Sequence, residues 1–353
     1  MRIAGVGRAF PSHYYDQGQL LEALRRHWMR EHFNPQRLER LHKNVLVGGR
    51  HLALTIEEYE ELETWGQAND AWIRVGLDVG ARAIEDALTR AGLTARDVDA
   101  IFTVTVTGVA TPSLDARLMN RLDFRSDVKR TPIFGLGCVA GAAGVVRAAD
   151  YVRAFPEHVA VLLSVELCSL TVQKQDLSIP NLIATGLFGD GAAATVITGA
   201  DVASAGAERG PQIVATRSVF YRGTERVMGW DISENGFGIV LSADVPKMVG
   251  RHLRGDLDEF LAQHGLEVGD IASWICHPGG PKVLTAMEEA FELPREAFEL
   301  TWRSLAELGN LSSSSVLMVL GDTLEQRPPD AGSWGVLLAM GPGFCSELVL
   351  LRF

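Results

Sequence analysis

Cys138 is the side chain in this sequence whose surroundings best suit a nucleophile. It lies in the segment FGLGCVAGAAG (134–144), between a short apolar stretch and a run with helical spacing. The unsatisfied N–H groups of a helix start favour a thiolate, and the glycines at 137, 141 and 144 allow close approach of backbone and substrate. The Cys138 N–H is also a candidate oxyanion donor. The alternative is a buried, inert cysteine, which is the usual role of a free thiol.

His277 is the candidate partner of this thiol. It lies in WICHPGGP (274–281), at the end of a predicted strand and directly before Pro-Gly-Gly. Because proline restricts the preceding residue and two glycines follow, the regular element must stop here, and the ring is expected to face a loop-lined cavity. There it could activate Cys138 as an ion-pair partner. A purely structural histidine is the alternative.

Asn310, in GNLSSSSV (309–316), is the third candidate. A neutral amide donor would hold a thioester carbonyl and stabilise the charge of a developing enolate. The alternative is a helix N-cap, a position that Asn and Ser both favour.

The elements that must position these three residues alternate between strand and helix patterns, which predicts an α/β fold. Strands are predicted at 101–106, 132–136, 159–165, 192–198, 212–221, 273–277, 333–341 and 345–353. Helices are predicted at 19–30, 75–92, from 112, at 139–152, from near 281 and after 309, with further helix in the polar stretch up to 74.

A weak internal echo runs through this pattern. In each half, a strand is followed by a glycine-containing turn, a first helix, a second helix start and paired closing strands. Two similar halves, residues 1–205 and 206–353, would place Cys138 and Asn310 on equivalent helices that meet at a pseudo-symmetric seam.

Composition bounds the kind of protein. The 353 residues are 47% hydrophobic and 22% charged, as in a globular protein with a core large enough to enclose a dry cavity. A net charge of −11 argues against general affinity for nucleic acid. Basic residues nevertheless gather at Arg37, Arg40, His42, Lys43 and Arg50, either as a phosphate site or as a solvated helix face.

The four cysteines, at 138, 168, 276 and 345, form no CxxC pair, which argues against a zinc site. We find no leader-like segment and no apolar run of about 18 residues. The sequence therefore predicts a soluble cytoplasmic protein with reduced thiols and no membrane insertion.

Five motifs taken together resemble those of type III polyketide synthases, the chalcone-synthase-like branch of the thiolase fold. They are GCVAGA, LFGDGAAA (187–194), CHPGGPKVL (276–284), GNLSSSSV and WGVLLAMGPG (334–343). The resemblance covers the chain from about residue 5 to its end. It implies a thiolase-like fold in which two βαβαβ-type halves form a five-layered αβαβα arrangement. It also implies a homodimer, with coenzyme A thioesters as substrates and no cofactor or metal.

In such an enzyme, Cys138 would hold the starter acyl group as a thioester. His277 and Asn310 would donate hydrogen bonds to the thioester oxygen of malonyl-CoA, and loss of CO2 would supply the carbanion. The enolate would then attack the Cys138 thioester and lengthen the chain by two carbons. A neutral donor at 310 suits this reaction, because a carboxylate would repel the enolate.

The resemblance also implies binding residues. Phe188 and Ile239 match the two gate positions between the coenzyme A tunnel and the cavity, and the second is aromatic in plant enzymes. Further cavity positions are Val106, Thr107, Glu166, Cys168, Thr171, Trp230, Ser312 and the loop Gly341, Pro342, Gly343, while Thr111 would reach into a partner's cavity. Coenzyme A would be bound by Arg37, Arg40, Lys43, Arg50, Gly279 and Gly280, with Asn44 where the family has another basic residue.

The function expected from these residues is iterative condensation of malonyl-CoA onto an acyl-CoA starter. Ile239, Cys168 and Val106 favour a medium- or long-chain starter, with cyclisation to alkylpyrones or alkylresorcinols. One alternative is a malonyl-primed synthase of the tetrahydroxynaphthalene type. A second is a priming ketosynthase that uses an acyl carrier protein. The HPGG motif argues against this alternative. A third, a non-catalytic homologue, would require loss of a catalytic residue, and all three are present.

Overall fold

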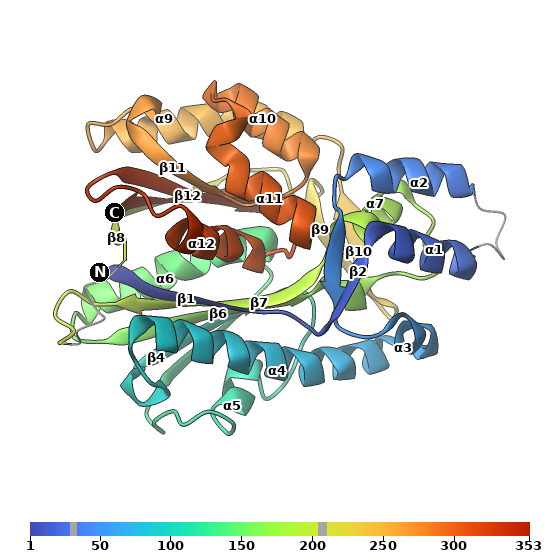
Figure 1. The fold of residues 1–353 in the computed structure, drawn as a ribbon, viewed down its shortest axis with the longest axis horizontal. Helices are drawn as coiled ribbons and strands as arrows, with labels where there is room; N and C mark the ends of the chain where they lie inside the picture. The colour runs from blue at the N-terminus through green and yellow to red at the C-terminus, as the bar shows by residue number, and fades with distance from the viewer. Residues whose placement is uncertain (29–33, 204–209) are drawn as a thin grey trace.

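The structure is a computed structural model that describes residues 1–28, 34–203 and 210–353. The boundary expected between residues 205 and 206 therefore lies outside the described residues, as does the end of the helix predicted at 19–30. Layers of helices and strands alternate through the molecule (Figure 1). This is the five-layered α/β arrangement that the sequence predicts, and no helix in the described part of the chain is long and apolar enough to cross a membrane.

The first half contributes five neighbouring strands. Their spatial order is β5–β4–β6–β7–β1, with β4 parallel to β5 and β6, and β7 antiparallel to β6 and β1. The bounds are β1 (Arg2–Ala9), β4 (Ala100–Thr105), β5 (Lys129–Phe134), β6 (Val159–Leu167) and β7 (Asp190–Thr198).

The second half repeats this pattern with four strands in the order β11–β12–β13–β8. One parallel pair, β11 with β12, is again followed by two antiparallel pairs. The bounds are β8 (Gln212–Phe220), β11 (Ile271–Cys276), β12 (Trp334–Gly341) and β13 (Cys345–Arg352). Among the described residues, the two sets of strands meet where Arg2 of β1 pairs with Gln212 of β8, and backbone hydrogen bonds from Ile3 N to Pro211 O and from Ile213 N to Met1 O flank this pair. The internal echo in the sequence thus corresponds to two strand groups of matching order.

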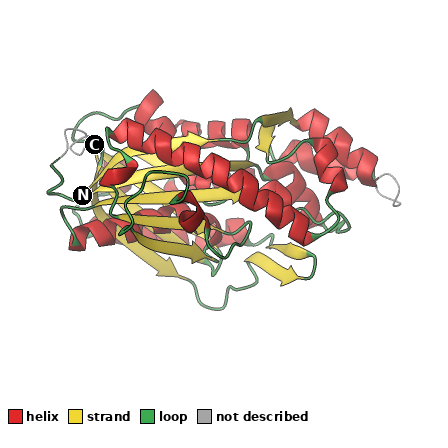
Figure 2. Ribbon diagram, turned by 90° about the horizontal axis from the view of Figure 1, so that it is seen from below, coloured by secondary structure: helices red, strands yellow, loops and turns green. Residues whose placement is uncertain are grey.

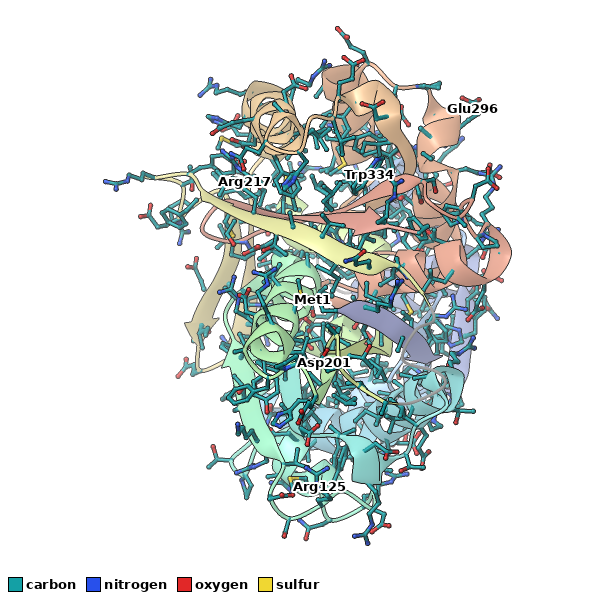
Figure 3. All side chains as sticks on the ribbon, turned by 90° about the vertical axis from the view of Figure 1, so that its left-hand side faces the viewer. Met1, Arg125, Asp201, Arg217, Glu296 and Trp334 are labelled. Atoms are coloured by element: carbon teal, nitrogen blue, oxygen red, sulfur yellow. The ribbon has the colours of Figure 1, made fainter. Side chains whose placement is uncertain are left out.

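Two helices lie between these strand groups. α6 (Ala140–Ala154) and α12 (Ser314–Gln326) contact each other, and each also contacts strands of both halves. α4 (Trp65–Ala91) and α5 (Leu114–Leu118) cover the outer face of the first group, which Figure 2 shows from below. α9 (Arg254–Ala262), α10 (Pro281–Phe291) and α11 (Glu299–Leu308) cover the second. Viewed from the side, Met1 lies at the seam, between Arg217 and Trp334 of one half and Asp201 and Arg125 of the other (Figure 3).

The remaining elements gather at one end of the molecule (Figure 1). They are the paired strands β2 (His13–Asp16) and β3 (Gly49–Leu52), the hairpin β9 (Met228–Ser233) and β10 (Gly236–Leu241), and the helices α1 (Gln17–Trp28), α2 (Pro35–Asn44), α3 (Ile56–Glu61) and α7 (Ile179–Leu187). α8 (Val245–Met248) leads from the hairpin into the outer helices of the second half.

Two local predictions were wrong. The polar stretch up to residue 74 contains the strand β3, because its pairing with β2 overrides a weak helical preference. The helix predicted from Pro112 through Leu122 is only the short α5, which begins at Leu114, and turns follow it at Arg121 and Leu122. Leu122 still packs against the core around α4, so its apolar spacing reports burial rather than a continuous helix.

A buried carboxyl joins the two halves. Glu166 of β6 accepts hydrogen bonds from Val106 N at 3.1 Å and Thr107 Oγ1 at 2.9 Å, and from the hydroxyl of Ser313 at the start of α12. The Ser313 hydroxyl also lies 2.8 Å from that of Ser164. Burial raises the pKa of Glu166 to about 7, and these hydrogen bonds offset only part of the shift.

The close approach of α6 to α12 depends on Gly141. A Cβ added to this residue would lie 2.1 Å from the main-chain oxygen of Ser313 and 2.8 Å from Cγ1 of Val316. Since one of these atoms belongs to the backbone, a side chain at 141 would push the two helices apart.

We expect Gly141→Ala to lower the free energy of unfolding by about 2–3 kcal/mol, because the added methyl overpacks the interface between the halves. The matched control is Gly255→Ala in α9, where an added Cβ meets no atom within 4 Å. That change should stabilise the protein by up to about 1 kcal/mol through helix propensity. Urea denaturation of both variants measures the difference, and equal effects would contradict the role given to Gly141.

Stability should also depend on the Glu166 proton. Because the folded-state pKa is raised above the ordinary 4.5, the folded protein keeps a proton that the unfolded chain releases. This contribution is fully present below about pH 4.5 and is lost as the pH rises through about 7. The loss in free energy of unfolding is on the order of 3 kcal/mol, and we expect it to be absent in Glu166→Gln. Urea denaturation at about pH 5 and about pH 7.5 would show it.

The control for this measurement is Glu296→Gln, which changes an exposed carboxyl and should follow the wild type. Parallel pH dependence in the wild type and Glu166→Gln would show that Glu166 does not carry the buried proton.

Candidate active site

Cys138 lies in a short 3₁₀ turn, Gly137–Val139, that links β5 to α6. The chain enters this turn with positive φ at Gly135 (100°) and Gly137 (59°), a conformation that favours glycine. A Cβ on Gly137 would lie 2.4 Å from Cδ of Pro342. The loop Gly341–Gly343 of the second half therefore packs directly against the turn that carries the thiol.

His277 directly follows β11, one residue beyond the observed strand end, whereas the predicted strand at 273–277 includes it. Its backbone N–H donates to the carbonyl of Leu338 in β12 at 2.9 Å, which fixes the main chain at the strand end. The imidazole is buried, and its Nδ1 has no hydrogen-bond partner among the described residues. The carbonyl of His277 accepts from Gly279 N at 2.9 Å, so the Pro-Gly-Gly segment turns tightly beneath it.

Asn310 lies between α11 and α12 and is held through both its backbone and its side chain. Its backbone forms a bridge with Phe188, in which Asn310 N donates to Leu187 O at 2.9 Å and Gly189 N donates to Asn310 O at 3.0 Å. In its amide, Oδ1 accepts from Ser312 N at 2.8 Å, and Nδ2 donates to Gly279 O at 3.3 Å. These contacts fix which face of the amide is the donor.

A continuous run of hydrogen bonds joins the three candidates. The thiol of Cys138 donates to Ser312 Oγ at 3.6 Å, and Ser312 N donates to Oδ1 of Asn310. Nδ2 of Asn310 donates to Gly279 O, and Gly279 N donates to His277 O. Ser312 has the left-handed φ of 48°, which a non-glycine residue adopts only where its surroundings impose it. The sequence indicated Ser312 only as a cavity position, and nothing in it indicated this linking role.

Burial sets the charge state of the thiol and the imidazole. It raises the pKa of Cys138 to about 12, although the hydrogen bond with Ser312 lowers it in part, and it lowers the pKa of His277 to about 3. Loss of hydration therefore favours a neutral thiol at Cys138 and a neutral imidazole at His277. The thiolate expected from the helix start alone is disfavoured in this structure, because desolvation is the largest influence on both groups.

A cavity of about 820 Å³ opens at the end of the molecule where α1, α3, α7 and the β9–β10 hairpin meet. Five of the predicted cavity positions line it: Cys168, Thr171, Phe188, Trp230 and Ile239. Trp230 and Ile239 are partners across the hairpin. Cys138, His277 and Asn310 are not among the residues that line this cavity. Phe188 does line it and pairs with Asn310 through the backbone, so it connects the cavity wall to the catalytic candidates.

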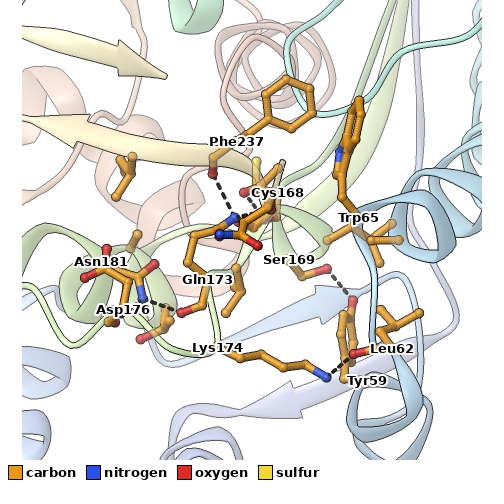
Figure 4. Close-up of a pocket in the computed structure, with 18 of the residues that line it drawn as sticks. Tyr59, Leu62, Trp65, Cys168, Ser169, Gln173, Lys174, Asp176, Asn181 and Phe237 are labelled. Carbon is orange, nitrogen blue, oxygen red and sulfur yellow. Dashed lines mark hydrogen bonds between the residues drawn. The ribbon is translucent and has the colours of Figure 1, made fainter. Parts of the chain in front are cut away.

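The wall of this cavity also contains residues that the sequence did not indicate. Figure 4 shows Tyr59 and Trp65 on one side of the segment that carries Cys168 and Gln173, with Phe237 nearby. Gln173 Nε2 donates to Phe237 O at 3.2 Å, and the rings of Trp65 and Phe237 meet edge to face at 5.8 Å. These residues come from segments without a recognisable motif, so only the folded chain brings them together.

The structure places the other predicted cavity residues elsewhere. Val106, Thr107, Glu166 and Ser312 are buried and do not line the cavity, nor does the loop Gly341, Pro342, Gly343. Thr107 and Glu166 instead belong to the buried network between the halves, where Thr107 also accepts from Trp72 Nε1 at 3.2 Å. Thr111 is exposed in the loop between β4 and α5.

The basic cluster divides into two groups. Arg37, Arg40 and Lys43 are exposed on α2, where a phosphate could reach them. Arg50 is only 2% exposed, and its guanidinium donates to the main-chain oxygens of Thr185 and Gly186. That Arg50 binds a coenzyme A phosphate stays a prediction: its terminal nitrogens are used inside the protein, but its Nε has no hydrogen-bond partner among the described residues, and the side chain lines the cavity.

The glycines of the HPGG motif lie at the start of α10. Gly279 is partly exposed, and Gly280 has a φ of 142° that suits glycine. Among the described residues, no group of three or more His, Cys, Asp or Glu side chains is arranged to hold a metal ion.

Comparison with known proteins was made for both sequence and fold. Residues 1–202 match the N-terminal domain and residues 212–353 the C-terminal domain of the chalcone and stilbene synthases. A 1,3,6,8-tetrahydroxynaphthalene synthase of Streptomyces peucetius subsp. caesius is 53% identical over 99% of this chain and 93% of its own length. A "putative chalcone synthase" of Bacillus subtilis is 36% identical over 99% of this chain and 98% of its own length.

Solved structures give the same result. The 1,3,6,8-tetrahydroxynaphthalene synthase of Streptomyces coelicolor A3(2), described as a bacterial type III polyketide synthase, superimposes with a TM-score of 0.91 at 32% identity, over 100% of this chain and 99% of that one. PKS-I of the brown alga Ectocarpus siliculosus gives 0.90 at 27% identity, over 99% and 97%. This chain therefore belongs to the chalcone and stilbene synthase family, the type III polyketide synthases, which are acyl-condensing transferases that use coenzyme A thioesters such as malonyl-CoA.

Proposed function

We propose that this chain uses malonyl-CoA as both starter and extender and forms 1,3,6,8-tetrahydroxynaphthalene. The observation that carries this proposal is the 53% identity, over nearly the whole of both chains, to a synthase of that product. Because of this identity, we favour the malonyl-primed alternative over the fatty acyl starter that the sequence predicted. The ten carbons of the naphthalene skeleton correspond to five two-carbon units, each left by one malonyl group that loses CO2.

In this proposal, Cys138 attacks the starter thioester, expels coenzyme A and passes its proton to the imidazole of His277. The Nδ2 of Asn310 and the His277 ring then donate to the thioester oxygen of the next malonyl-CoA. As CO2 leaves, its bonding electrons form the enolate, which attacks the Cys138 thioester and releases the thiolate. No cofactor is required, because decarboxylation itself supplies the carbanion.

Coenzyme A is proposed to bind outside the cavity, with its phosphates near Arg37, Arg40 and Lys43 on α2 and its thioester directed toward Gly279 and Gly280. The exposed cations suit this role, because a phosphate needs charge that is not already neutralised inside the protein. Phe188, which lines the cavity and pairs with Asn310, and Ile239, on the facing hairpin, would form the passage for the growing chain.

A second candidate is the medium- or long-chain acyl starter, which leads to alkylpyrones or alkylresorcinols. The observation that favours it is the apolar part of the cavity wall, which includes Leu20, Leu24 and Leu62 beside Cys168 and Ile239. Such a surface would stabilise an alkyl chain by about 0.8 kcal/mol for each buried methylene. Val106 gives no support to this candidate, since it does not line the cavity.

We also propose a homodimer, formed through the free edge of β5. Among the described residues this strand pairs only with β4, its residues are largely exposed, and Phe134 at its end is 46% exposed. An exposed strand edge with an apolar residue is a surface that natural proteins cover. Thr105 and Phe134 pair at the ends of β4 and β5, so Thr111, in the loop after β4, would lie near the partner.

Incubation with malonyl-CoA alone, followed by mass spectrometry, should yield 1,3,6,8-tetrahydroxynaphthalene. The reaction is then repeated with acyl-CoAs from acetyl to palmitoyl and with one aromatic starter. Cys138→Ala is the control and should give no condensation product with any starter. Pyrones or resorcinols whose mass follows the starter, together with no product from malonyl-CoA alone, would overturn the malonyl-primed proposal in favour of the acyl-primed one.

For the dimer, sedimentation velocity of the wild type should show a species of twice the chain mass of 38.3 kDa. Phe134→Glu places a charge on the proposed edge and should shift the protein toward monomer by at least about tenfold in dissociation constant. Phe155→Glu is the control, because Phe155 is similarly exposed (41%) but follows α6 rather than lying on β5. A wild-type monomer, or equal effects of the two variants, would contradict dimerisation through β5.

A further inference from the structure

Arg50 is a buried cation that no step of the proposed reaction uses. It comes from β3, at the end of the molecule that holds the cavity. One terminal nitrogen donates to Gly186 O at 2.7 Å and to the side chain of Gln17, and the other donates to Thr185 O. Burial lowers its pKa to about 10, with Asp190 opposing the shift, so the guanidinium is charged near neutral pH.

The carbonyls that Arg50 binds belong to the last turn of α7. A helix leaves its last four carbonyls without partners in the helix, and a cation there is also favoured by the helix dipole. In α7, Leu187 O accepts from Asn310 N, while the Arg50 guanidinium satisfies Thr185 O and Gly186 O. Gln17 Nε2 adds a second bond to Gly186 O at 3.0 Å. Arg50 thus closes the end of the helix that leads directly into Phe188.

The aliphatic part of Arg50 packs where two catalytic segments cross. A Cβ added to Gly189 would lie 3.2 Å from Cβ of Arg50, and one added to Gly309 would lie 3.6 Å from its Cδ. Gly189 follows Phe188, and Gly309 precedes Asn310. The Arg50 side chain therefore packs against both segments that form the Phe188–Asn310 bridge. It also caps the helix that precedes Phe188.

Arginine suits this place better than lysine. Its planar fork directs donors at two neighbouring carbonyls at once, whereas an ammonium group on a flexible stem acts as a point charge. A buried cation costs free energy unless it is well hydrogen-bonded, and Arg50 Nε has no hydrogen-bond partner among the described residues. A cation at this place therefore calls for a functional explanation.

We propose that Arg50 is a positioning residue for the condensation reaction, which fixes the end of α7 and thereby the placement of Phe188 and of the Asn310 amide. Arg50 also lines the cavity, but its terminal nitrogens donate to Gln17, Thr185 and Gly186, so we place its effect on the catalytic segment and not on substrate. This inference rests on the proposed catalytic role of Asn310 and is independent of which starter the enzyme accepts.

The test compares Arg50→Met, Arg50→Lys and Asn310→Ala in release of CO2 from malonyl-CoA, with kcat and KM measured separately. Met keeps most of the apolar stem and removes every donor, so we expect kcat to fall about 100-fold, since a misplacement of about 1 Å in a catalytic group can have that effect. KM should change by less than about threefold, because the donors that are lost serve carbonyls of the protein itself. Arg50→Lys should recover part of the rate, to within about tenfold of the wild type, because it restores a donor.

Two further measurements separate positioning from general damage. Thermal unfolding reports whether each variant is folded. If Arg50→Met does not fold, the kinetics of Arg50→Lys test the positioning role instead. Alkylation of Cys138, which lies on another segment, should proceed at the wild-type rate in every Arg50 variant. Arg96→Met is the matched control, because Arg96 is exposed and paired with Asp123 on the surface, and it should leave both rates unchanged.

The outcomes are distinct. A rise in KM with kcat retained would indicate that Arg50 binds substrate, and this would overturn the proposal. Unchanged kinetics in Arg50→Met would also overturn it. If Asn310→Ala keeps the wild-type rate of CO2 release, the catalytic role of Asn310 fails, and the positioning role fails with it. A loss in Asn310→Ala together with wild-type behaviour of Arg50→Met would leave the proposed function standing and remove only the inference about Arg50.

Discussion

The contact between α6 and the start of α12 is the constraint on which the rest of this molecule depends. Gly141 allows the main chain of one half to lie against Ser313 of the other, and the Ser313 hydroxyl binds the buried carboxyl of Glu166. Cys138 immediately precedes α6, and Asn310 and Ser312 immediately precede α12. The same packing that joins the halves therefore brings the thiol within hydrogen-bond reach of Ser312 and, through it, of the Asn310 amide.

The sequence predicted the elements that a strong local pattern defines. Strands with a continuous apolar run, the helix after Cys138 and the strand before His277 were found at nearly the expected bounds. Family motifs supplied the five-layered fold and the activity class. Sequence failed at β3, where tertiary pairing decides the structure, and at α5, where apolar spacing reports burial without a continuous helix.

The candidate site shows the same division. Cys138, His277 and Asn310 follow from residue type and motif, but the hydrogen bonds that connect them pass through main-chain atoms of Ser312 and Gly279, which no side-chain pattern encodes. Arg50 illustrates the limit most clearly. The family resemblance implies a phosphate ligand for it, and only the folded chain shows that its terminal nitrogens donate to carbonyls of α7 and to Gln17.

The β9–β10 hairpin has a consequence for how such enzymes diversify. Within the parts of the chain that the structure describes, its two strands pair only with each other, and it supplies Trp230 and Ile239 to the cavity wall. Phe188, by contrast, is paired through its backbone with Asn310. Substitutions on the hairpin can therefore reshape the cavity without disturbing the catalytic segments, whereas changes near Phe188 alter both together. Natural variation in substrate choice should accumulate on the hairpin, where evolution can explore new products while the chemistry is preserved.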